Sequence, residues 1–174
     1  VSETFQQRNT NASIEDAYEQ LKHIQDLCIK YKKELVVYIS MGFGNPYGDP
    51  YHEEIVLEWA QKIAALEIKT ISLADTIGLA SSKQVGSLTQ QLINSLPKIE
   101  IGVHLHSKVD NWKGKLDAAL DAGCLRVDGA LKGIGGCPMA GNDLVGNMNT
   151  ELMLPYLKNI GLLSEINQEA LSQS

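Results

Sequence analysis

Two histidines separated by one residue, His104 and His106, are the side chains whose spacing most directly suggests chemistry. Residues two apart in a β-strand point to the same face, so both imidazoles would converge on one point. Two nitrogen ligands on a rigid strand are a good start on a divalent metal site. The same spacing also suits two half-buried histidines that hydrogen-bond to their neighbours, so the spacing alone leaves both interpretations open.

A glycine-rich segment around Cys137 could also contribute chemistry. Residues 132–138 read Lys-Gly-Ile-Gly-Gly-Cys-Pro, and the conformational freedom of glycine lets such a loop close over a ligand. The Cys137 thiol would act as a general acid or base if its pKa were shifted, whereas a loop cysteine that only packs is the simpler interpretation. Asn147 carries an amide oxygen that could bind a metal ion, although asparagine is also an ordinary turn residue.

Asp75 opens a third segment, Asp75-Thr76-Ile77-Gly78. Its carboxylate could take part in catalysis, but a carboxylate before a tight turn is more often a cap. The other cysteines and histidines are predicted to have no chemical role: Cys28 and Cys124 are expected to pack, and His23 and His52 to lie on solvated helix surfaces.

Four apolar runs predict the strands that would position these groups. They span residues 35–39, 69–75, 99–106 and 125–131. The first, Leu35–Ile39, is nearly continuous, as is typical of a parallel strand buried on both faces. The candidate chemical groups all lie at the carboxyl end of a predicted strand or in the loop after it: Asp75, His104, His106, Cys137 and Asn147. That edge carries the ligand site in α/β proteins, so we expect these groups to lie together.

Capping signals and apolar spacing predict helices between the strands. Ser13 would cap a helix that runs to Tyr31, because its hydroxyl can accept a hydrogen bond from the backbone N–H of Asp16. Asp49 followed by Pro50 is predicted to start the next helix. Further helices are expected near residues 81–96, 111–122 and 149–160, with a short one within 162–174. Four strand–helix repeats predict parallel, right-handed units in one domain, in an open sheet or a closed barrel.

The composition limits the classes of function. The chain has 174 residues, of which 44% are hydrophobic and 21% charged, as expected for one globular domain. Its net charge of −6 and the lack of a basic stripe argue against a nucleic-acid partner. No apolar run reaches the roughly 18 residues of a membrane span. Three irregularly spaced cysteines favour a reducing compartment, and we predict a cytoplasmic protein.

Several segments together carry a family resemblance. They are Ser2–Phe5, Ser13–Glu15, Phe43–Tyr47, Ile71–Gly78, Val103–His106, Val127-Asp128 and Gly133–Pro138, with Gly146-Asn147 after the last. In order and spacing the chain resembles the 3-hydroxy-3-methylglutaryl-CoA lyase family, within a superfamily of metal-dependent lyases and Claisen-type synthases. The Gly-Gly-Cys-Pro loop is the most specific match, because the related synthases share the His-x-His and Gly-Asn motifs but typically lack this loop.

The resemblance implies both a fold and a reaction. The fold is a (β/α)8 TIM barrel, and residues 1–174 would be the C-terminal portion of its one catalytic domain. This portion would run from the end of strand 4, at Val1–Phe5, through the helix after strand 8. The reaction is the retro-Claisen cleavage of 3-hydroxy-3-methylglutaryl-CoA to acetyl-CoA and acetoacetate, with Mg²⁺ or Mn²⁺ as the cofactor.

The resemblance also implies roles for individual residues. The metal ligands would be His104, His106 and Asn147. The catalytic residues would be Cys137, Asp75 and His104, with Cys137 serving or assisting the protonation of the acetyl-CoA enolate. The substrate would be bound by Tyr38, Ser72 and Thr76.

The chain departs from the family pattern at three places. Asn45 stands where many relatives have a cysteine, and Gly141 where many have a basic residue. The family's first strand, whose end bears an Arg-Asp pair with a metal ligand, has no counterpart here. We therefore expect an incomplete barrel that is inactive alone. Its ligand would be a small acyl-CoA molecule, and its partner either further copies of the chain or the remainder of the barrel.

Three alternatives to the lyase stay open. A Claisen-type synthase or an aldolase of the same superfamily would condense acetyl-CoA with a 2-oxo acid, although the Gly-Gly-Cys-Pro loop argues against it. A non-catalytic half-barrel module would lose only metal binding in the variant His106→Ala. An unrelated α/β metal hydrolase would need a carboxylate base beside its metal.

Overall fold

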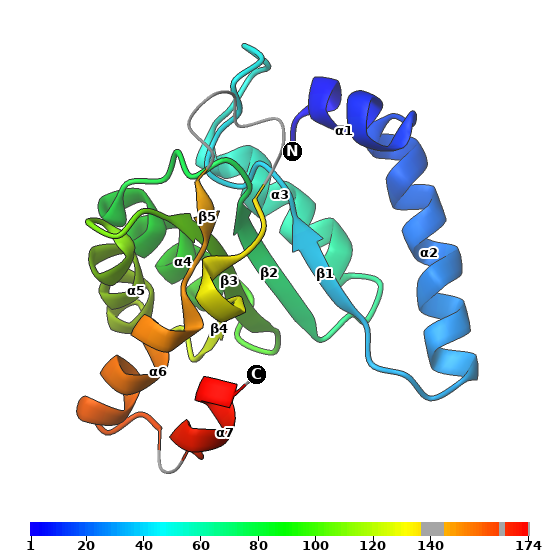
Figure 1. Cartoon of the computed structure of the whole chain (residues 1–174). Coiled ribbons are helices and arrows are strands. Elements are labelled where there is room, and N and C mark those ends of the chain that lie inside the picture. The colour runs from blue at the N-terminus through cyan, green and yellow to red at the C-terminus, as the bar shows by residue number, and fades with distance from the viewer. Residues whose placement is uncertain (137–144, 164–165, 174) are drawn as a thin grey trace.

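A parallel sheet backed by helices forms the centre of the computed structural model, which describes residues 1–136, 145–163 and 166–173 (Figure 1). Its parallel strands lie side by side in chain order: β1 (Val36–Ile39), β2 (Thr70–Asp75), β3 (Glu100–Ser107) and β4 (Arg126–Asp128). The two-residue strand β5 (Gly146–Asn147) pairs antiparallel with the end of β3, beyond the point where β4 has ended. The strand order confirms the predicted parallel strand–helix units.

The helices largely begin where the capping signals place them. Helix α2 (Ile14–Lys30) starts after Ser13, and α4 (Ser82–Ser95) starts after Ser81, each with a reciprocal capping box. The others are α3 (Glu53–Ala64), α5 (Trp112–Asp121), α6 (Thr150–Asn159) and the short α7 (Gln168–Gln173). Local sequence therefore predicts most of the helices in the described residues.

Glu3–Phe5 are helical, which corrects this part of the expectation that Val1–Phe5 ends a strand, whereas Ser2 is extended and Val1 and Ser2 precede the helix. Helix α1 (Glu3–Thr10) begins at Ser2, whose hydroxyl accepts from the backbone N–H of Phe5. The Asp49 carboxylate accepts from the backbone N–H of Thr4 at 2.9 Å and also from the Ser2 hydroxyl. Asp49 thus binds the N-terminus of α1 and does not cap α3. Helix α3 begins at Glu53 rather than at Asp49-Pro50.

The predicted fourth strand, residues 125–131, is also shorter in the structure. Strand β4 ends at Asp128, and Leu131–Gly133 form a 3₁₀ turn in which Lys132 has a φ of 56°. The apolar run extends past the strand because Leu131 continues the hydrophobic pattern without continuing the backbone pairing.

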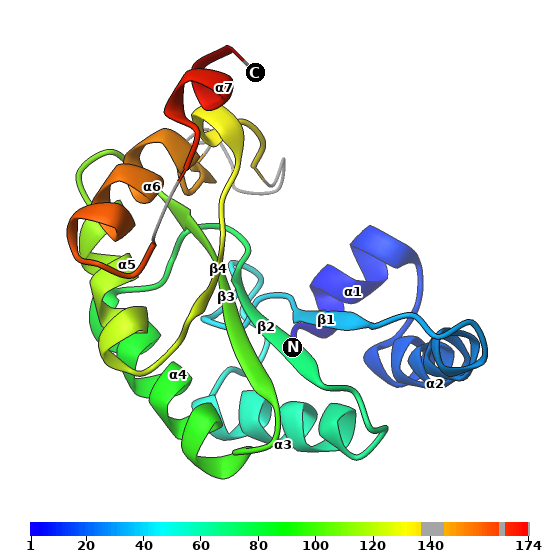
Figure 2. The same cartoon turned by 90° about the horizontal axis from the view of Figure 1, so that it is seen from below.

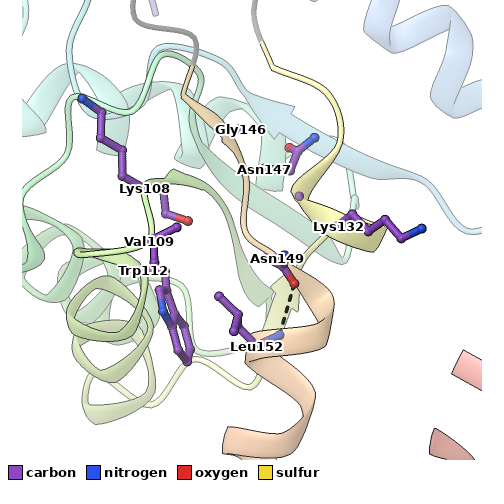
Figure 3. A pocket seen from close by; sticks show the side chains of 10 residues that line it. Lys108, Val109, Trp112, Lys132, Gly146, Asn147, Asn149 and Leu152 are labelled. Atoms are coloured by element: carbon purple, nitrogen blue, oxygen red, sulfur yellow. Dashed lines mark hydrogen bonds between the residues drawn. The ribbon is translucent and has the colours of Figure 1, made fainter. Parts of the chain in front are cut away.

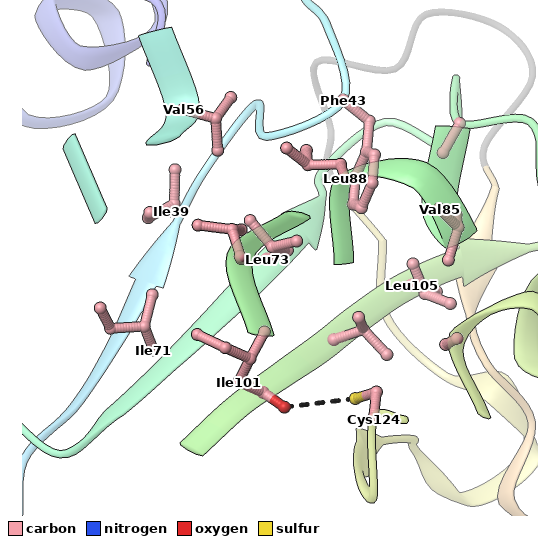
Figure 4. Packing of buried hydrophobic residues seen from close by; sticks show 14 of the residues in the cluster. Ile39, Phe43, Val56, Ile71, Leu73, Val85, Leu88, Ile101, Leu105 and Cys124 are labelled. Carbon is pink, nitrogen blue, oxygen red and sulfur yellow. Dashed lines mark hydrogen bonds between the residues drawn. The ribbon is translucent and has the colours of Figure 1, made fainter. Parts of the chain in front are cut away.

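The hydrophobic core lies between the sheet and helices α3, α4 and α5 (Figure 4). Every second residue of β2 and β3 points toward these helices, among them Ile71, Leu73, Ile101, Val103 and Leu105. The residues between them face the other way. The pairing register places Tyr38, Ser72, Ala74, His104 and Asp128 on this second face, which we call the open face of the sheet.

The side of the molecule beyond β1 is packed more loosely. Figure 2 shows α1 and α2 apart from the helices that cover the sheet. The predicted apolar face of α2 is only half-buried, with Ile24 and Tyr31 exposed, and the one side chain that this helix buries is Gln25. Within β1 only Ile39 is buried, which corrects the expectation of a strand covered on both faces. None of the described helices combines the length and apolar character of a membrane-spanning segment.

Candidate active site

Side chains from several strands line a hollow of about 390 Å³ on the open face, at the carboxyl ends of the strands. The lining residues are Tyr38, Ser40, Ala74, Thr76, His104, His106, Gly136 and Asn147. The register explains why they meet, because Ala74 lies opposite His104 and His106 lies opposite Asn147. The structure therefore brings together the two histidines, Asn147, Tyr38 and Thr76, as the sequence predicts.

His106 is buried and is oriented by one hydrogen bond. Its Nδ1 lies 3.2 Å from the backbone carbonyl oxygen of Val145. Because a carbonyl oxygen only accepts, Nδ1 carries the proton and Nε2 keeps its lone pair. Burial, and then the neighbouring His104, lower the pKa of His106. The neutral imidazole that results is the form that binds a metal ion.

His104 is flanked by two groups that sequence reasoning did not connect to it. Its Nδ1 lies 3.5 Å from a carboxylate oxygen of Asp128, and the Tyr38 hydroxyl donates to the same oxygen at 2.7 Å. The ring centroids of His104 and His106 are 5.4 Å apart. The bond to Asp128, together with burial, raises the pKa of Tyr38, so its phenol stays protonated. In the sequence Asp128 appears only within the Val127-Asp128 match and inside the predicted strand 125–131, and its register with His104 is seen only in the folded chain.

Asn147 lines the hollow and carries an unpaired amide oxygen. Its Nδ2 donates to the backbone carbonyl of Ile134 at 2.8 Å, while its Oδ1 is buried with no hydrogen-bond partner in the described part of the chain. An orphaned amide oxygen beside two imidazoles fits a divalent cation, since carbonyl-type oxygens are good ligands for Mg²⁺ and Mn²⁺. Among the described residues no three His, Cys, Asp or Glu side chains are placed to hold one metal ion, so the candidate donor set there is two imidazoles and one amide.

A narrow stem of glycines holds Asn147 in place. The backbone N–H of Asn147 donates to the carbonyl of Gly135, and a Cβ on Gly135 would lie 2.8 Å from Asn147 Nδ2. A Cβ on Gly136 would lie 2.8 Å from the Val145 carbonyl oxygen, and one on Gly146 would lie 2.7 Å from that of Gly133. The two backbone segments approach this closely because they lack side chains.

Asp75 does not line the hollow, so the geometry gives no support to its predicted role as a catalytic carboxylate. It pairs in register with Leu105, on the face that packs against the helices. One of its oxygens accepts from the backbone N–H of Ala80 at 3.1 Å, and the other from Lys115 Nζ at 2.7 Å. Its side chain is 1% exposed. With both oxygens engaged on the far face, Asp75 caps the β2–α4 turn and pairs with a buried lysine.

The remaining predicted residues occupy different positions. Ser72 points toward the open face, but it is fully buried, it does not line the hollow, and its hydroxyl has no partner among the described residues. Thr76 lines the hollow, and its hydroxyl accepts from the backbone N–H of Met41 at 2.8 Å. Cys137 lies outside the described residues, and its neighbour Gly136 lines the hollow.

A second hollow of about 330 Å³ adjoins the first, and Asn147 contributes to both (Figure 3). Lys108 and Lys132 lie on opposite sides of it, and Trp112 and Leu152 contribute apolar surface. Asn149 also lines it and caps α6 by accepting from the backbone N–H of Leu152. Lysine charge thus borders the candidate site in a chain whose net charge is −6.

Comparisons with known proteins agree on one family. A family model described as HMGL-like matches residues 1–174. The chain is 28% identical over 174 residues to the mitochondrial hydroxymethylglutaryl-CoA lyase of Mus musculus, and the match covers 53% of that protein. The chain spans about half the length of the curated relatives it matches.

Solved structures give the same result for the fold. The crystal structure of the HMG-CoA lyase of Bacillus subtilis matches with a TM-score of 0.90 at 29% identity, covering 98% of this chain and 57% of that one. An HMG-CoA lyase of Acinetobacter baumannii, solved with coenzyme A and 3-methylmalate, matches with a TM-score of 0.86 at 27% identity, covering 99% and 56%. These lyases are TIM barrels, and the parallel sheet described above corresponds to about half of one.

Proposed function

This chain belongs to the HMGL-like family, and from that premise we propose that it is part of a metal-dependent carbon–carbon lyase acting on an acyl-CoA. The reaction is the cleavage of 3-hydroxy-3-methylglutaryl-CoA to acetyl-CoA and acetoacetate. The names of the matched relatives support this substrate, and so does the coenzyme A bound to one of them. The observation that carries the proposal is the unpaired amide oxygen of Asn147 beside two imidazoles.

The metal-binding residues in this proposal are His104, His106 and Asn147, and the ion is Mg²⁺ or Mn²⁺. Both histidines direct Nδ1 toward an oxygen acceptor, Asp128 for His104 and Val145 for His106, which leaves each Nε2 for the cation. When bound, a divalent cation supplies Lewis-acid polarisation of the substrate's hydroxyl and carboxyl oxygens.

The chain's own residues then bind the substrate and move protons. Loss of the proton from the substrate's tertiary hydroxyl gives the ketone of acetoacetate as the C–C bond breaks, and the bond electrons form the acetyl-CoA enolate. His104 and Tyr38 line the hollow, and Asp128, which lies against both of them, is the carboxylate of the site that would accept the hydroxyl proton. The thiol of Cys137 donates a proton to the enolate carbon, a role that rests on its place in the Gly-Gly-Cys-Pro loop.

We further propose that residues 1–174 are the C-terminal portion of one TIM-barrel domain, whose remaining strands close the sheet between β4 and β1. The backbone nitrogen of Val1 donates to the Ser40 carbonyl at 2.7 Å, so Val1 lies at the carboxyl end of β1, where a parallel neighbouring strand would end. A groove of about 210 Å³ between α2 and β1 offers apolar surface to that strand.

A second copy of the chain suits this position less well. In a parallel barrel each helix packs over the seam between its own strand and the next. In a ring of two copies, the seam between β4 of one copy and β1 of the other would receive both α6 and α2. The groove is better filled by the strand that directly precedes α1 and α2 in the chain. These two helices would then be its own following helices, and no extra helix would have to fit over the seam.

Metal titration tests the site. Isothermal titration with Mn²⁺ is expected to show one site per chain, which is lost in His106→Ala and weakened in Asn147→Ala. The exposed Asn94→Ala serves as the control and is expected to bind as the parent chain does. Equal Mn²⁺ affinity in all variants would contradict the proposed site.

Activity tests the reaction. The barrel completed with the missing strands is expected to release acetoacetate from 3-hydroxy-3-methylglutaryl-CoA when Mg²⁺ or Mn²⁺ is present. Condensation of acetyl-CoA with a 2-oxo acid in place of cleavage would identify a Claisen-type synthase instead. Metal binding with neither reaction would indicate a non-catalytic module.

A further inference from the structure

Lys115 on α5 is a buried charged residue that takes no part in the proposed chemistry. Its side chain is 2% exposed. Its ammonium nitrogen lies 2.7 Å from Asp75 Oδ2, 2.8 Å from the backbone carbonyl oxygen of His106 and 3.3 Å from that of Gly78. An ammonium group has three N–H donors, so these three acceptors use its full capacity.

Burying a charged side chain at the position of Lys115 costs free energy, because its ammonium group loses its contact with water. Removing an ammonium and a carboxylate from water costs several kcal/mol per ion, and a well-packed apolar pair often stabilises a core as well or better. Stability alone is therefore a weak reason for this lysine. Its three acceptors instead share a location, since Asp75 ends β2, Gly78 lies in the turn that follows, and His106 lies at the end of β3.

His106 is thereby held at two points. Lys115 binds its backbone carbonyl from the helix side of the sheet, and the Val145 carbonyl binds its ring from the open face. Gly78 connects the two contacts. A Cβ on Gly78 would lie 2.8 Å from Val145 Cγ1, so this turn packs directly against Val145 while its carbonyl accepts from Lys115.

We propose that Lys115 is a positioning residue for His106: it fixes the end of β3 relative to β2 and thereby sets the direction of the His106 imidazole. The metal-binding consequence rests on the proposed function, whereas the positioning of the ring does not. Lys115 acts through the backbone, from the face opposite the hollow. In the sequence Lys115 stands between two residues of the helix face that packs on the core, the half-buried Trp112 and the buried Leu116.

The ring itself gives the first test, in ¹⁵N-labelled chain. The Nδ1–H proton of His106 is expected to exchange slowly in the parent chain and to be lost or strongly shifted in Lys115→Met. The matched control is Lys113→Met, two residues away on the same helix, where the lysine side chain is 54% exposed and pairs with Asp117. An unchanged His106 signal in a folded Lys115→Met chain would overturn the proposal.

Mn²⁺ affinity gives the second test. The expected loss in Lys115→Met is about ten-fold or more, the range seen when groups that orient a metal ligand are removed, with no loss in Lys113→Met. Because Lys115→Met leaves Asp75 unpaired and could unfold the chain, the double variant Asp75→Asn/Lys115→Met is measured beside it. It removes both charges, yet the donor to His106 is still missing.

The double variant separates positioning from simple stability. If Lys115 positions His106, the Mn²⁺ affinity of the double variant stays about ten-fold below that of the parent chain, even where the two chains have the same thermal unfolding temperature. If Mn²⁺ affinity returns with stability, Lys115 is only structural and the proposal fails. A parent chain that binds no Mn²⁺ would contradict the proposed metal site, and the ring signal of His106 would still decide the role of Lys115.

Discussion

Helices α2 and α4 have the same kind of N-terminal cap but differ strongly in how far their side chains are buried. Both start at a serine with a capping box, and both repeat apolar residues at helical spacing. Helix α4 buries Val85, Leu88, Thr89 and Leu92 between the sheet and its neighbours, whereas α2 buries only the side chain of Gln25. Apolar spacing thus specifies which face of a helix needs a partner, but not that the partner lies in the same stretch of chain.

The same contrast extends to the strands. Strands β2 and β3 are almost fully buried and carry the site, while β1 has a neighbour on one side only in the described residues. The β2–β3 side is therefore a completely packed core, which we call the finished side. The β1–α2 side is a partly exposed surface on which a further strand could pack. We expect these two sides to differ in stability as well as in burial.

The largest expected effect is on the finished side. Leu88→Ala removes a fully buried side chain from the centre of the core, and the free energy of unfolding should fall by about 3 kcal/mol because a cavity remains. Urea unfolding followed by circular dichroism measures this loss.

The matched control lies on the other side. Leu27 on α2 is 53% exposed, and Leu27→Ala should change the free energy of unfolding by less than about 0.5 kcal/mol. Equal losses in the two variants would show that α2 is covered in solution, and the contrast would fail.

A smaller effect separates the two capped helices. Ser81→Ala and Ser13→Ala each remove a side-chain cap that contributes about 1 kcal/mol. We expect Ser81→Ala to lower the global free energy of unfolding, because α4 unfolds with the core. Ser13→Ala should instead accelerate amide hydrogen exchange within α2, with little change in the global value. If both variants lower the global stability equally, α2 belongs to the same cooperative unit as α4.

The smallest effect is local and depends on pH. Hydrogen bonds from Ser2 and then Thr4 hold the pKa of Asp49 below its usual value of 3.8. A lowered carboxyl pKa stabilises the folded state above the unfolded value, and this contribution is lost as the pH falls through the lower folded value. The Thr4 amide signal should therefore stay constant down to about pH 4 and shift only below it, with no shift in Asp49→Asn. The same low-pH shift of the Thr4 amide in Asp49→Asn would contradict this assignment.

Local signals in the sequence account for most of the fold. The serine caps and the apolar runs predict α2, α4 and the parallel strands, because these features depend on neighbouring residues. Helix α1 was missed, although Ser2 is a local cap, because its mostly polar residues show no apolar periodicity and Phe5 is the one side chain it buries. Strand β5 has two residues, too few for any periodicity to predict it.

The candidate site was predictable to the extent that strand alternation determines it. His104 and His106 share a face as their spacing predicts, and the pairing register brings Asn147 beside them. The face of Asp75 follows from the same alternation once its register with Leu105 is known, which no local signal gives. Lys115 contributes through tertiary contacts alone, so its role could be seen only in the folded chain. The chemical roles of the site residues stay predictions until the titrations above are made.

The glycine stem beneath Asn147 has a consequence for how such a protein can diversify. Residues 133–136 and 145–147 run side by side, so the segment between them must leave and return at one place. Doubling the length of such a segment costs only about 0.6 kcal/mol in closure entropy, whereas one methyl group on Gly136 or Gly146 would force the stem apart. The number of residues between the stem's ends can thus change at little cost in free energy without moving the histidines, provided that the proposed proton donor Cys137 is kept.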